Sequence, residues 1–369
     1  MKPSRNFFNH LNNIWDESDA VFPIDQRLPQ SAKQQLLKNL GASWVITEDG
    51  NKVKLDNGIQ VDAGDALVIA TSGTTGKPKG VVHTHASITA SVIAAGNRLG
   101  CCSTDHWLSC LPLAHVGGLS VLLRAQHYKS ELTIIDSVDQ TSLNDATTLG
   151  ANLTSLVPTA LQKLNVSSFR AVLVGGSAIL RELPANAITT YGLTETMGGI
   201  VYNGKPLDGV AIRLSSNGEI EIQGEMLFRK YRDGTDPKSP DGWFTTGDLG
   251  EIDDGVLTVH GRRDDLINTG GYKVWPTVVE NSINQIDGVI ECVVMGLPDT
   301  QWGQTVCSWI VLKNLDTSLR LEDVRRHVKE SLPDYCAPHK LFIVEHIPRS
   351  AIGKVLTVEL SKIKSLFHE

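Results

Sequence analysis

Continuous apolar runs that end in turn-forming segments dominate the first half of the chain. Residues 66–70 (ALVIA) form such a run, and the small and apolar residues of 82–99 recur at helical spacing. Two more apolar runs, at 154–158 and 169–176, predict buried strands that end in turns. Strands that alternate with helices predict a largely parallel sheet covered on both faces, which is an α/β architecture.

Beyond about residue 205 the pattern changes to short alternating segments separated by Gly, Asn and Asp. We interpret these as a β-rich subdomain; the segments are GVAIRL, GEIEIQG and GVLTVHG. A second change follows the polar stretch 261–274, after which 276–287 predicts a helix, 289–298 a strand and 321–333 an amphipathic helix that Pro333 ends.

These two changes divide the chain into two predicted domains. We place a large N-terminal body at residues 1–263 and a small C-terminal α+β domain at residues 264–369. The second segment, of about 100 residues, has an ordinary domain size. Its polar beginning, GRRDD, is the natural hinge.

Composition excludes several classes of function. The 369 residues carry 34 Lys and Arg against 41 Asp and Glu, a net charge of −7, whereas nucleic-acid binding needs clustered positive charge. No apolar run is long enough for a membrane span, and the first residues lack the apolar core of a signal peptide. The six cysteines include no CxxC pair, which argues against a disulfide framework or a zinc site. We therefore expect a cytoplasmic protein.

The strongest chemical signal is the segment TSGTTGKPKG at residues 71–80, which we expect to join a strand to a helix. Its glycines let main-chain N–H groups turn toward an anion, its hydroxyl groups donate hydrogen bonds, and its lysines add positive charge. The segment is not a Walker A loop, because only two residues separate Gly73 from Gly76 and because Lys77 precedes Pro78. A polyphosphate fits this loop; the candidate contacts are Ser72, Gly73, Thr74, Thr75, Gly76, Lys77 and Lys79.

Four more motifs follow in order: YGLTETMGG (191–199), GWFTTGDLG (242–250), GRRDDLINTGGYKVWPTVVE (261–280) and IPRSAIGKV (347–355). With TSGTTGKPKG they make the chain resemble the adenylate-forming enzymes, which include acyl-CoA synthetases, luciferases and peptide-synthetase adenylation domains. The resemblance runs from about residue 20 to residue 356. It implies a reaction in which a carboxylate attacks the α-phosphate of ATP, pyrophosphate leaves, and a thiol then displaces AMP. ATP, Mg²⁺ and coenzyme A as co-substrate are the implied cofactors.

The resemblance also implies roles for residues around the nucleotide. Glu195 matches the Mg²⁺ ligand, Thr194 a phosphate donor and Tyr191 the residue that stacks on adenine. The remaining matches are contacts of the ribose, the phosphates or the nearby backbone: Gly175, Gly176, Ser177, Gly192, Asp248 and Arg262.

Lys354 matches the lysine that reaches the α-phosphate and the carboxylate during adenylation, and Asp264 matches the hinge residue. By resemblance, rotation of the small domain removes Lys354 and brings a different set of residues to the pocket for the thiol step. That set consists of Gly270, Gly271, Tyr272 and Lys273.

The segment LPLAHVGGLSVLLRA at 111–125 matches the family's acid-binding region. His115 stands at its gating position, and Gly117 and Gly198 match neighbours of the acid. Arg124 is the one cation in this apolar run, and it either pairs with a second carboxylate of the substrate or extends along the surface to water.

The chain departs from the family's pattern at several points. Only 14 residues separate Gly176 from Tyr191, Thr190 stands where Asn or Gln is usual, and FRKY at 228–231 replaces a Gly-Tyr ending. Fewer residues than usual precede the phosphate loop, and the initial Met favours a naturally short N-terminus.

The short N-terminus and the segments LPLAHVGGLSVLLR and TETMGGIVYNGKPLDGV resemble o-succinylbenzoate–CoA ligases of menaquinone synthesis. Their substrate is a dicarboxylate, which suits Arg124, and we take this as the leading function. The alternatives are a medium-chain or aromatic acid CoA ligase, a stand-alone adenylation enzyme that loads a carrier protein, and a catalytically silent nucleotide-binding relative. The sequence leaves a homodimer open.

Overall fold

The computed structural model describes residues 5–47, 50–56, 58–72, 78–176, 183–314, 319–349, 355–363 and 365–366. The chain forms two compact units, and each is described by itself. The first comprises Met1–Arg213, Glu221–Thr245 and Asp253–Leu257, and the second comprises Leu214–Ile220, Thr246–Ile252 and Thr258–Glu369. The predicted domain boundary at residue 263 stays a prediction.

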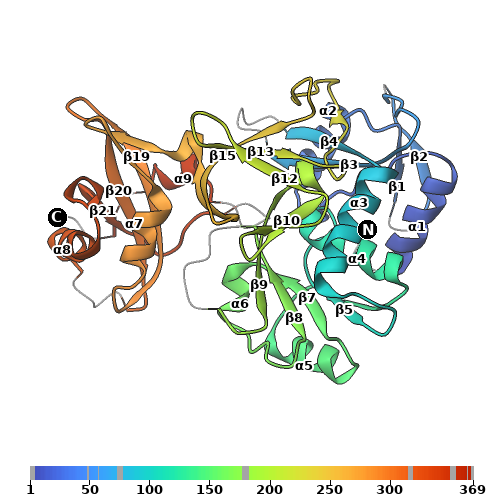
Figure 1. Cartoon of the computed structure of the whole chain (residues 1–369), viewed down its shortest axis with the longest axis horizontal. Coiled ribbons are helices and arrows are strands. Elements are labelled where there is room, and N and C mark those ends of the chain that lie inside the picture. Colours follow the sequence, from blue (N-terminus) through green and yellow to red (C-terminus); the bar gives the residue numbers. More distant parts are fainter. Residues whose placement is uncertain are drawn as a thin grey trace. The chain divides into compact units, whose positions relative to one another are not determined.

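A seven-stranded sheet forms the centre of the first unit, in the order β11-β10-β9-β8-β7-β5-β6 (Figure 1). Its strands are β5 (His106–Ser109), β6 (Glu131–Ile134), β7 (Leu153–Leu156), β8 (Ala171–Val174), β9 (Ala187–Leu193), β10 (Gly198–Tyr202) and β11 (Lys205–Pro206). The pairs from β6 to β9 are parallel, and β10 and β11 complete the sheet with antiparallel pairs.

Helices cover both faces of this sheet, as strand β8 shows. Ala171 and Leu173 pack with residues of α3 and α4, whereas Val172 and Val174 pack with residues of α5 and α6. Successive side chains of a strand point to opposite faces, so an apolar run such as AVLV needs cover on both sides. The helices are α3 (His85–Leu99), α4 (Val116–Tyr128), α5 (Gln140–Thr148) and α6 (Pro158–Leu161). The predicted mainly parallel sheet and α/β class are confirmed.

One local prediction is wrong: the Gly-rich segment does not join a strand to a helix. It connects β3 (Asp65–Ser72) to β4 (Pro78–Thr84), which pair antiparallel, and the helix begins only at His85. Residues 82–84 therefore belong to a strand. The apolar side chains of Val81 and Val82 are buried in the hairpin, and the capping box of Thr84 and Ser87 sets the start of α3.

Strand β4 also pairs with β14 (Lys230–Tyr231), giving the sheet order β14-β4-β3. The pairing is antiparallel and sets Tyr231 opposite Val81. The N-terminal part of the unit adds α1 (Arg5–Asp16), α2 (Gln30–Asn39), β1 (Trp44–Ile46) and β2 (Lys52–Lys54).

The β-rich segment forms a four-stranded sheet in the order β12-β13-β15-β16. Its strands are β12 (Ala211–Leu214), β13 (Glu219–Gln223), β15 (Phe244–Asp253) and β16 (Val256–Arg262), and the division between the units runs through it.

An antiparallel hairpin of β19 (Val289–Asp299) and β20 (Gly303–Leu312) forms the core of the second unit. Its other elements are β17 (Ile267–Thr269), β18 (Tyr272–Val274), β21 (Lys340–Ile343), α7 (Pro276–Ile283), α8 (Leu321–Ser331) and α9 (Thr357–Leu360). The predicted order helix, strand, helix is present, although α7 ends at Ile283 rather than near residue 287. Among the described residues, no helix is both long and apolar enough to cross a lipid bilayer.

Candidate active site

A tight turn between β9 and β10 carries Thr194 and Glu195. The two strands pair Leu193 with Gly198, and Thr194–Thr196 form one turn of 3₁₀ helix between them. The Thr196 hydroxyl oxygen accepts a hydrogen bond from the Leu193 N–H at 2.8 Å and lies 2.7 Å from the Gly198 carbonyl oxygen. The hairpin is so tight that a Cβ added at Gly192 would overlap the Gly198 carbonyl oxygen.

The Glu195 carboxylate lies in the same cluster as Lys79, another predicted residue. The Tyr231 hydroxyl donates a hydrogen bond to Glu195 Oε1 at 3.0 Å, and the Lys79 ammonium nitrogen lies 4.7 Å from the centre of the Tyr231 ring. The sequence motifs did not single out Tyr231. The departure FRKY could have pointed to it, because the usual Gly-Tyr ending has lost its glycine there but kept its tyrosine.

His83 supports the turn from β4 and was also missed. Its ring is fully buried, with Nε2 2.8 Å from the Thr194 carbonyl oxygen and Nδ1 3.1 Å from Ser87 Oγ. Burial lowers the pKa of His83 to about 4, so the ring is neutral at physiological pH. Because a carbonyl only accepts, Nε2 carries the proton and donates to Thr194.

Glu195 fits the expected Mg²⁺. Mg²⁺ takes hard oxygen ligands and is usually held by one or two carboxylates together with substrate phosphates and water. The described residues include no group of three or more His, Cys, Asp and Glu side chains that could hold a metal. Glu195 would therefore hold the ion jointly with the nucleotide, where the ion would neutralise phosphate charge.

At the carboxyl end of β8, the chain passes close to β9. A Cβ added at Gly175 would overlap Thr190 Oγ1, and Gly176 has a φ of +91°, which favours glycine. Thr190 donates its hydroxyl proton to the Val174 carbonyl at 3.2 Å. The structure thus brings Gly175 beside Thr190, the residue that precedes Tyr191.

His115 occupies the N-cap position of α4 but makes no side-chain capping hydrogen bond. It lies next to Asp25, and the sequence did not single out Asp25. The His115 Nε2 and an Asp25 carboxylate oxygen are 3.7 Å apart, and Arg27 also binds Asp25. Burial lowers the pKa of His115, although the neighbouring Asp25 acts in the opposite direction. His115, the predicted gating residue, is thus near a carboxylate of its own chain.

Arg124 is buried in the middle of α4, so the interpretation that it extends along the surface is wrong. Only 4% of the residue is exposed, and its guanidinium lies 4.8 Å from the centre of the Trp107 ring. It has no hydrogen bond or ion pair with any described residue, and Nε is a buried donor without an acceptor. The guanidinium is a buried charge that lacks a counter-ion among these residues.

Small residues lie between Arg124 and the β9–β10 hairpin. Ser120 lies one helical turn before Arg124, and a Cβ added at Gly198 would lie 3.7 Å from Ser120 Oγ. Gly117 lies one further turn along the same face of α4. Gly117, Ser120 and Arg124 therefore share one face of α4, and Gly198 lies beside Ser120.

The second unit holds a further set of predicted residues, which are Asp248, Arg262, Asp264, Gly270, Gly271 and Lys273. Arg262 Nε is 2.9 Å from Asp248 Oδ1, and Arg262 also donates to the Thr246 carbonyl at 2.8 Å. Asp264 is exposed in the short helix Arg263–Asp265. Gly270 and Gly271 have positive φ at the tip of the β17–β18 hairpin, and Lys273 is exposed on β18.

Seven predicted residues lie outside the described part of the chain, as does the side chain of Ser72. They are Gly73, Thr74, Thr75, Gly76, Lys77, Ser177 and Lys354. Their roles stay predictions.

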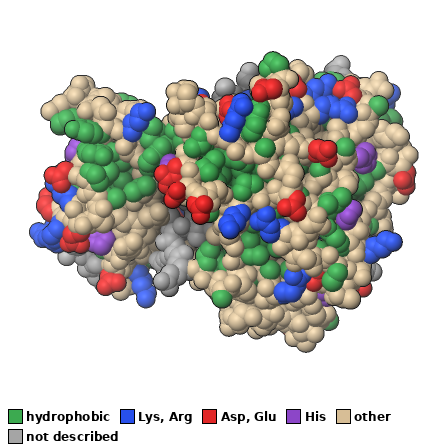
Figure 2. All heavy atoms as spheres, in the orientation of Figure 1, with side chains coloured by type: hydrophobic (Ala, Val, Ile, Leu, Met, Phe, Trp, Pro, Cys, Tyr) green, Lys and Arg blue, Asp and Glu red, His purple; other side chains and the backbone are tan. Residues whose placement is uncertain are grey.

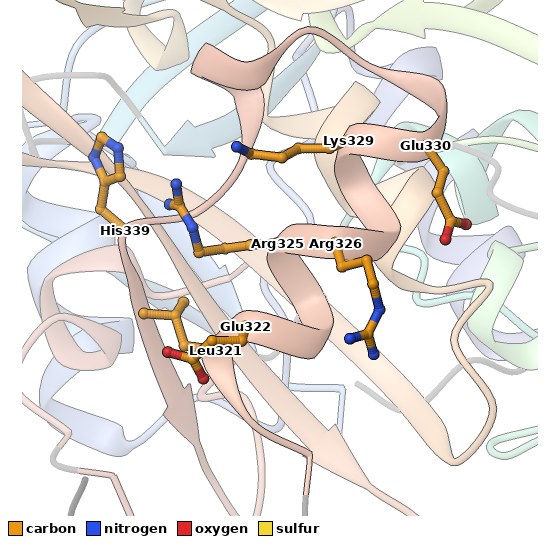
Figure 3. A pocket seen from close by; sticks show the side chains of 7 residues that line it. All are labelled: Leu321, Glu322, Arg325, Arg326, Lys329, Glu330 and His339. Carbon is orange, nitrogen blue, oxygen red and sulfur yellow. The ribbon is translucent and has the colours of Figure 1, made fainter.

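No predicted residue lines the hollow beside α8, which is shown in Figure 3. Arg325 donates there to the Pro338 carbonyl at 2.6 Å, and Lys329 pairs with Asp334. On the face shown in Figure 2, basic side chains are interspersed with acidic ones.

We predict that His83 makes stability depend on pH. Its pKa falls from 6.5 to about 4 on folding, so its stabilising effect is complete above pH 6.5 and is lost as the pH falls toward 4. This difference is worth about 3 kcal/mol. Urea unfolding at several pH values should show wild type losing about that much free energy of unfolding relative to His83→Gln between pH 7 and pH 4. Parallel pH profiles would contradict the prediction.

Comparisons with known proteins identify the family of the chain. A family model described as AMP-binding enzyme matches residues 18–231, and one described as AMP-binding enzyme C-terminal domain matches 278–354. A probable 2-succinylbenzoate–CoA ligase of Mycobacterium tuberculosis (strain CDC 1551 / Oshkosh) is 41% identical, over 81% of this chain and 84% of that protein. The 2-succinylbenzoate–CoA ligase of Bacillus mycoides (strain KBAB4) is 33% identical, over 80% and 69%.

A solved structure of o-succinylbenzoate CoA synthetase from Bacillus subtilis, in complex with the acyl-adenylate intermediate OSB-AMP, has the same fold. It superposes with a TM-score of 0.77 at 26% identity and covers 97% of this chain and 81% of that one. With one family model over more than half of its length and a relative that is 41% identical, this chain belongs to the AMP-binding enzymes, the adenylate-forming family.

Proposed function

We propose that this enzyme is an ATP-dependent o-succinylbenzoate–CoA ligase that acts through an acyl-adenylate. A carboxylate oxygen of the acid attacks the α-phosphorus of ATP and pyrophosphate leaves. The sulfur of coenzyme A then attacks the acyl carbon, and AMP leaves. The names of the relatives support this choice of acid and acceptor.

The observation that carries the choice of acid is the buried Arg124. A desolvated guanidinium without a counter-ion is costly, and a carboxylate is the anion that best matches its planar set of donors. An acid that is activated through one carboxylate needs a second carboxylate to pair with Arg124. A dicarboxylate such as o-succinylbenzoate meets this need, whereas a fatty acid does not.

The line from Glu195 through Gly198 and Ser120 to Arg124 supports an orientation for the acid. Its reacting carboxylate would lie near the Thr194–Glu195 turn, and its second carboxylate would lie at Arg124. Gly198 and Ser120, the residues between the two ends of this line, have small side chains.

Phosphoryl-centred chemistry depends on positioning and on charge neutralisation more than on acid–base catalysis. In this proposal, Lys79 and Thr194 bind phosphate oxygens, and Glu195 holds Mg²⁺. Asp248 and Arg262 bind the ribose, and Tyr191 packs on the adenine. Lys354 contacts the reacting groups during adenylation, and rotation at Asp264 then presents Gly270, Gly271 and Lys273 to coenzyme A. A cytoplasmic location, where ATP and coenzyme A are available, is part of the proposal.

Pyrophosphate exchange over a panel of acids tests the function. We expect acid-dependent exchange of labelled pyrophosphate into ATP with o-succinylbenzoate, and a CoA thioester when coenzyme A is added. Strong exchange with a medium-chain fatty acid but none with o-succinylbenzoate would contradict the proposal. Acyl transfer only to a phosphopantetheinyl carrier protein would indicate the carrier-loading alternative instead.

We predict that Arg124→Met lowers kcat/KM for o-succinylbenzoate by about 100-fold or more, because one partner of a desolvated charge pair is lost. Benzoylpropionate lacks the ring carboxylate and o-butyrylbenzoate lacks the aliphatic one. One of these two monocarboxylic acids keeps the carboxylate that the enzyme activates. That acid should react equally well with wild type and with Arg124→Met, since it has no second charge for Arg124. Arg98→Met, which removes an exposed arginine, is the matched control. An equal loss on every acid would argue against pairing with the substrate.

For Lys354, we predict that Lys354→Ala abolishes formation of the adenylate but leaves thiolysis of supplied acyl-adenylate intact. The two half-reactions are measured separately, by pyrophosphate exchange and by CoA thioester formation from synthetic adenylate. Equal loss of both would refute a role confined to the first step.

A further inference from the structure

Two strands and one turn converge on the side chain of Tyr231. Its own strand, β14, pairs antiparallel with β4 and sets Tyr231 opposite Val81. Lys79 lies two residues before Val81 on the same face of β4, which makes it a diagonal cross-strand neighbour of Tyr231. The third contact comes from the β9–β10 turn, through Glu195.

Tyr231 and its neighbour Phe228 hold both the backbone and the side chain of Glu195. The Phe228 N–H donates to the Glu195 carbonyl at 2.9 Å, and the Tyr231 hydroxyl donates to Oε1 at 3.0 Å. The other carboxylate oxygen, Oε2, accepts no hydrogen bond from a described residue. One oxygen of Glu195 is thus fixed by the protein, while the other is available to a metal ion.

The ring of Tyr231 contacts the second charged group. Lys79 Nζ lies 4.7 Å from the ring centre, within the range of a cation–π interaction. The ring itself is held rigidly, because only 8% of Tyr231 is exposed and Phe228 packs against it at 4.9 Å between ring centres. One tyrosine side chain therefore contacts both a carboxylate and an ammonium group.

We infer that Tyr231 is a positioning residue for the adenylation step. Its hydroxyl would orient Glu195 toward Mg²⁺, and its ring supports Lys79, so that one side chain positions both the metal ligand and the cation for the polyphosphate. The inference rests on the proposed adenylation of an acid by ATP. It goes beyond that proposal because it names Tyr231, a residue of β14, as the group that orients the metal ligand Glu195.

Tyr231→Phe separates this role from packing, because phenylalanine keeps the buried ring and the support for Lys79 but removes the hydroxyl. Tyr128→Phe, at a partly buried tyrosine near the end of α4, is the matched control. Tyr231→Leu removes the ring as well. Thermal unfolding of all three variants reports whether the fold is retained.

The first measurement does not depend on activity. Electron paramagnetic resonance follows Mn²⁺ binding to the enzyme in the presence of a non-hydrolysable ATP analogue with a methylene group between the α- and β-phosphorus. We expect Tyr231→Phe to weaken Mn²⁺ binding about tenfold, the value of one hydrogen bond to a charged group, with metal-free nucleotide binding unchanged. Tyr231→Leu should weaken metal-free nucleotide binding too, because Lys79 loses its support.

The second measurement is pyrophosphate exchange as a function of Mg²⁺ concentration. At limiting Mg²⁺, Tyr231→Phe should lower the exchange rate about tenfold, and it should raise the Mg²⁺ concentration needed for half-maximal rate, while the KM for the acid stays at the wild-type value. Wild-type Mn²⁺ affinity in Tyr231→Phe would overturn the inference, as would a loss of rate that high Mg²⁺ does not reduce and that matches a lowered melting temperature. Failure of wild type to use o-succinylbenzoate would contradict the proposed function alone, since the Mn²⁺ measurement needs no acid.

Discussion

The close approach of β9 and β10 is the constraint on which the candidate site depends. Gly192 has no room for a side chain, because the Gly198 carbonyl occupies the space of its Cβ. This approach forces the intervening residues into a single 3₁₀ turn, and the turn presents Glu195 toward Tyr231. The same hairpin places Gly198 against Ser120 of α4, so one backbone geometry positions both the proposed metal ligand Glu195 and the proposed acid contact Gly198.

Around this turn, the protein treats buried charge in two ways. His83 is buried as a neutral ring whose two nitrogens both have partners, so its burial costs little at neutral pH. Arg124 is equally buried but remains a cation without a counter-ion among the described residues. The arrangement of His83 is typical of a structural support. The arrangement of Arg124 is typical of a binding site for an anion.

The sequence predicted the parallel sheet because apolar runs such as 171–174 leave no solvent face. It failed at 82–84, where valine, histidine and threonine suit a strand as well as a helix, and where antiparallel pairing with β3 decides. Tyr231 and His83 were missed for a related reason. Their importance comes from contacts with a turn more than thirty residues away, and a local motif cannot show such contacts. Glu195 and Arg124, in contrast, stand out by charge within short motifs.

Ser87 has a consequence for how this site responds to heat. Its hydroxyl closes the capping box of α3 and also contacts His83, which in turn holds the Thr194 carbonyl. Fraying of the first turn of α3 therefore releases the histidine and loosens the turn that carries Glu195. Helix ends open at much lower free energies than whole units. We therefore expect the turn that carries Glu195 to loosen at a lower temperature than the one at which the sheet behind it unfolds.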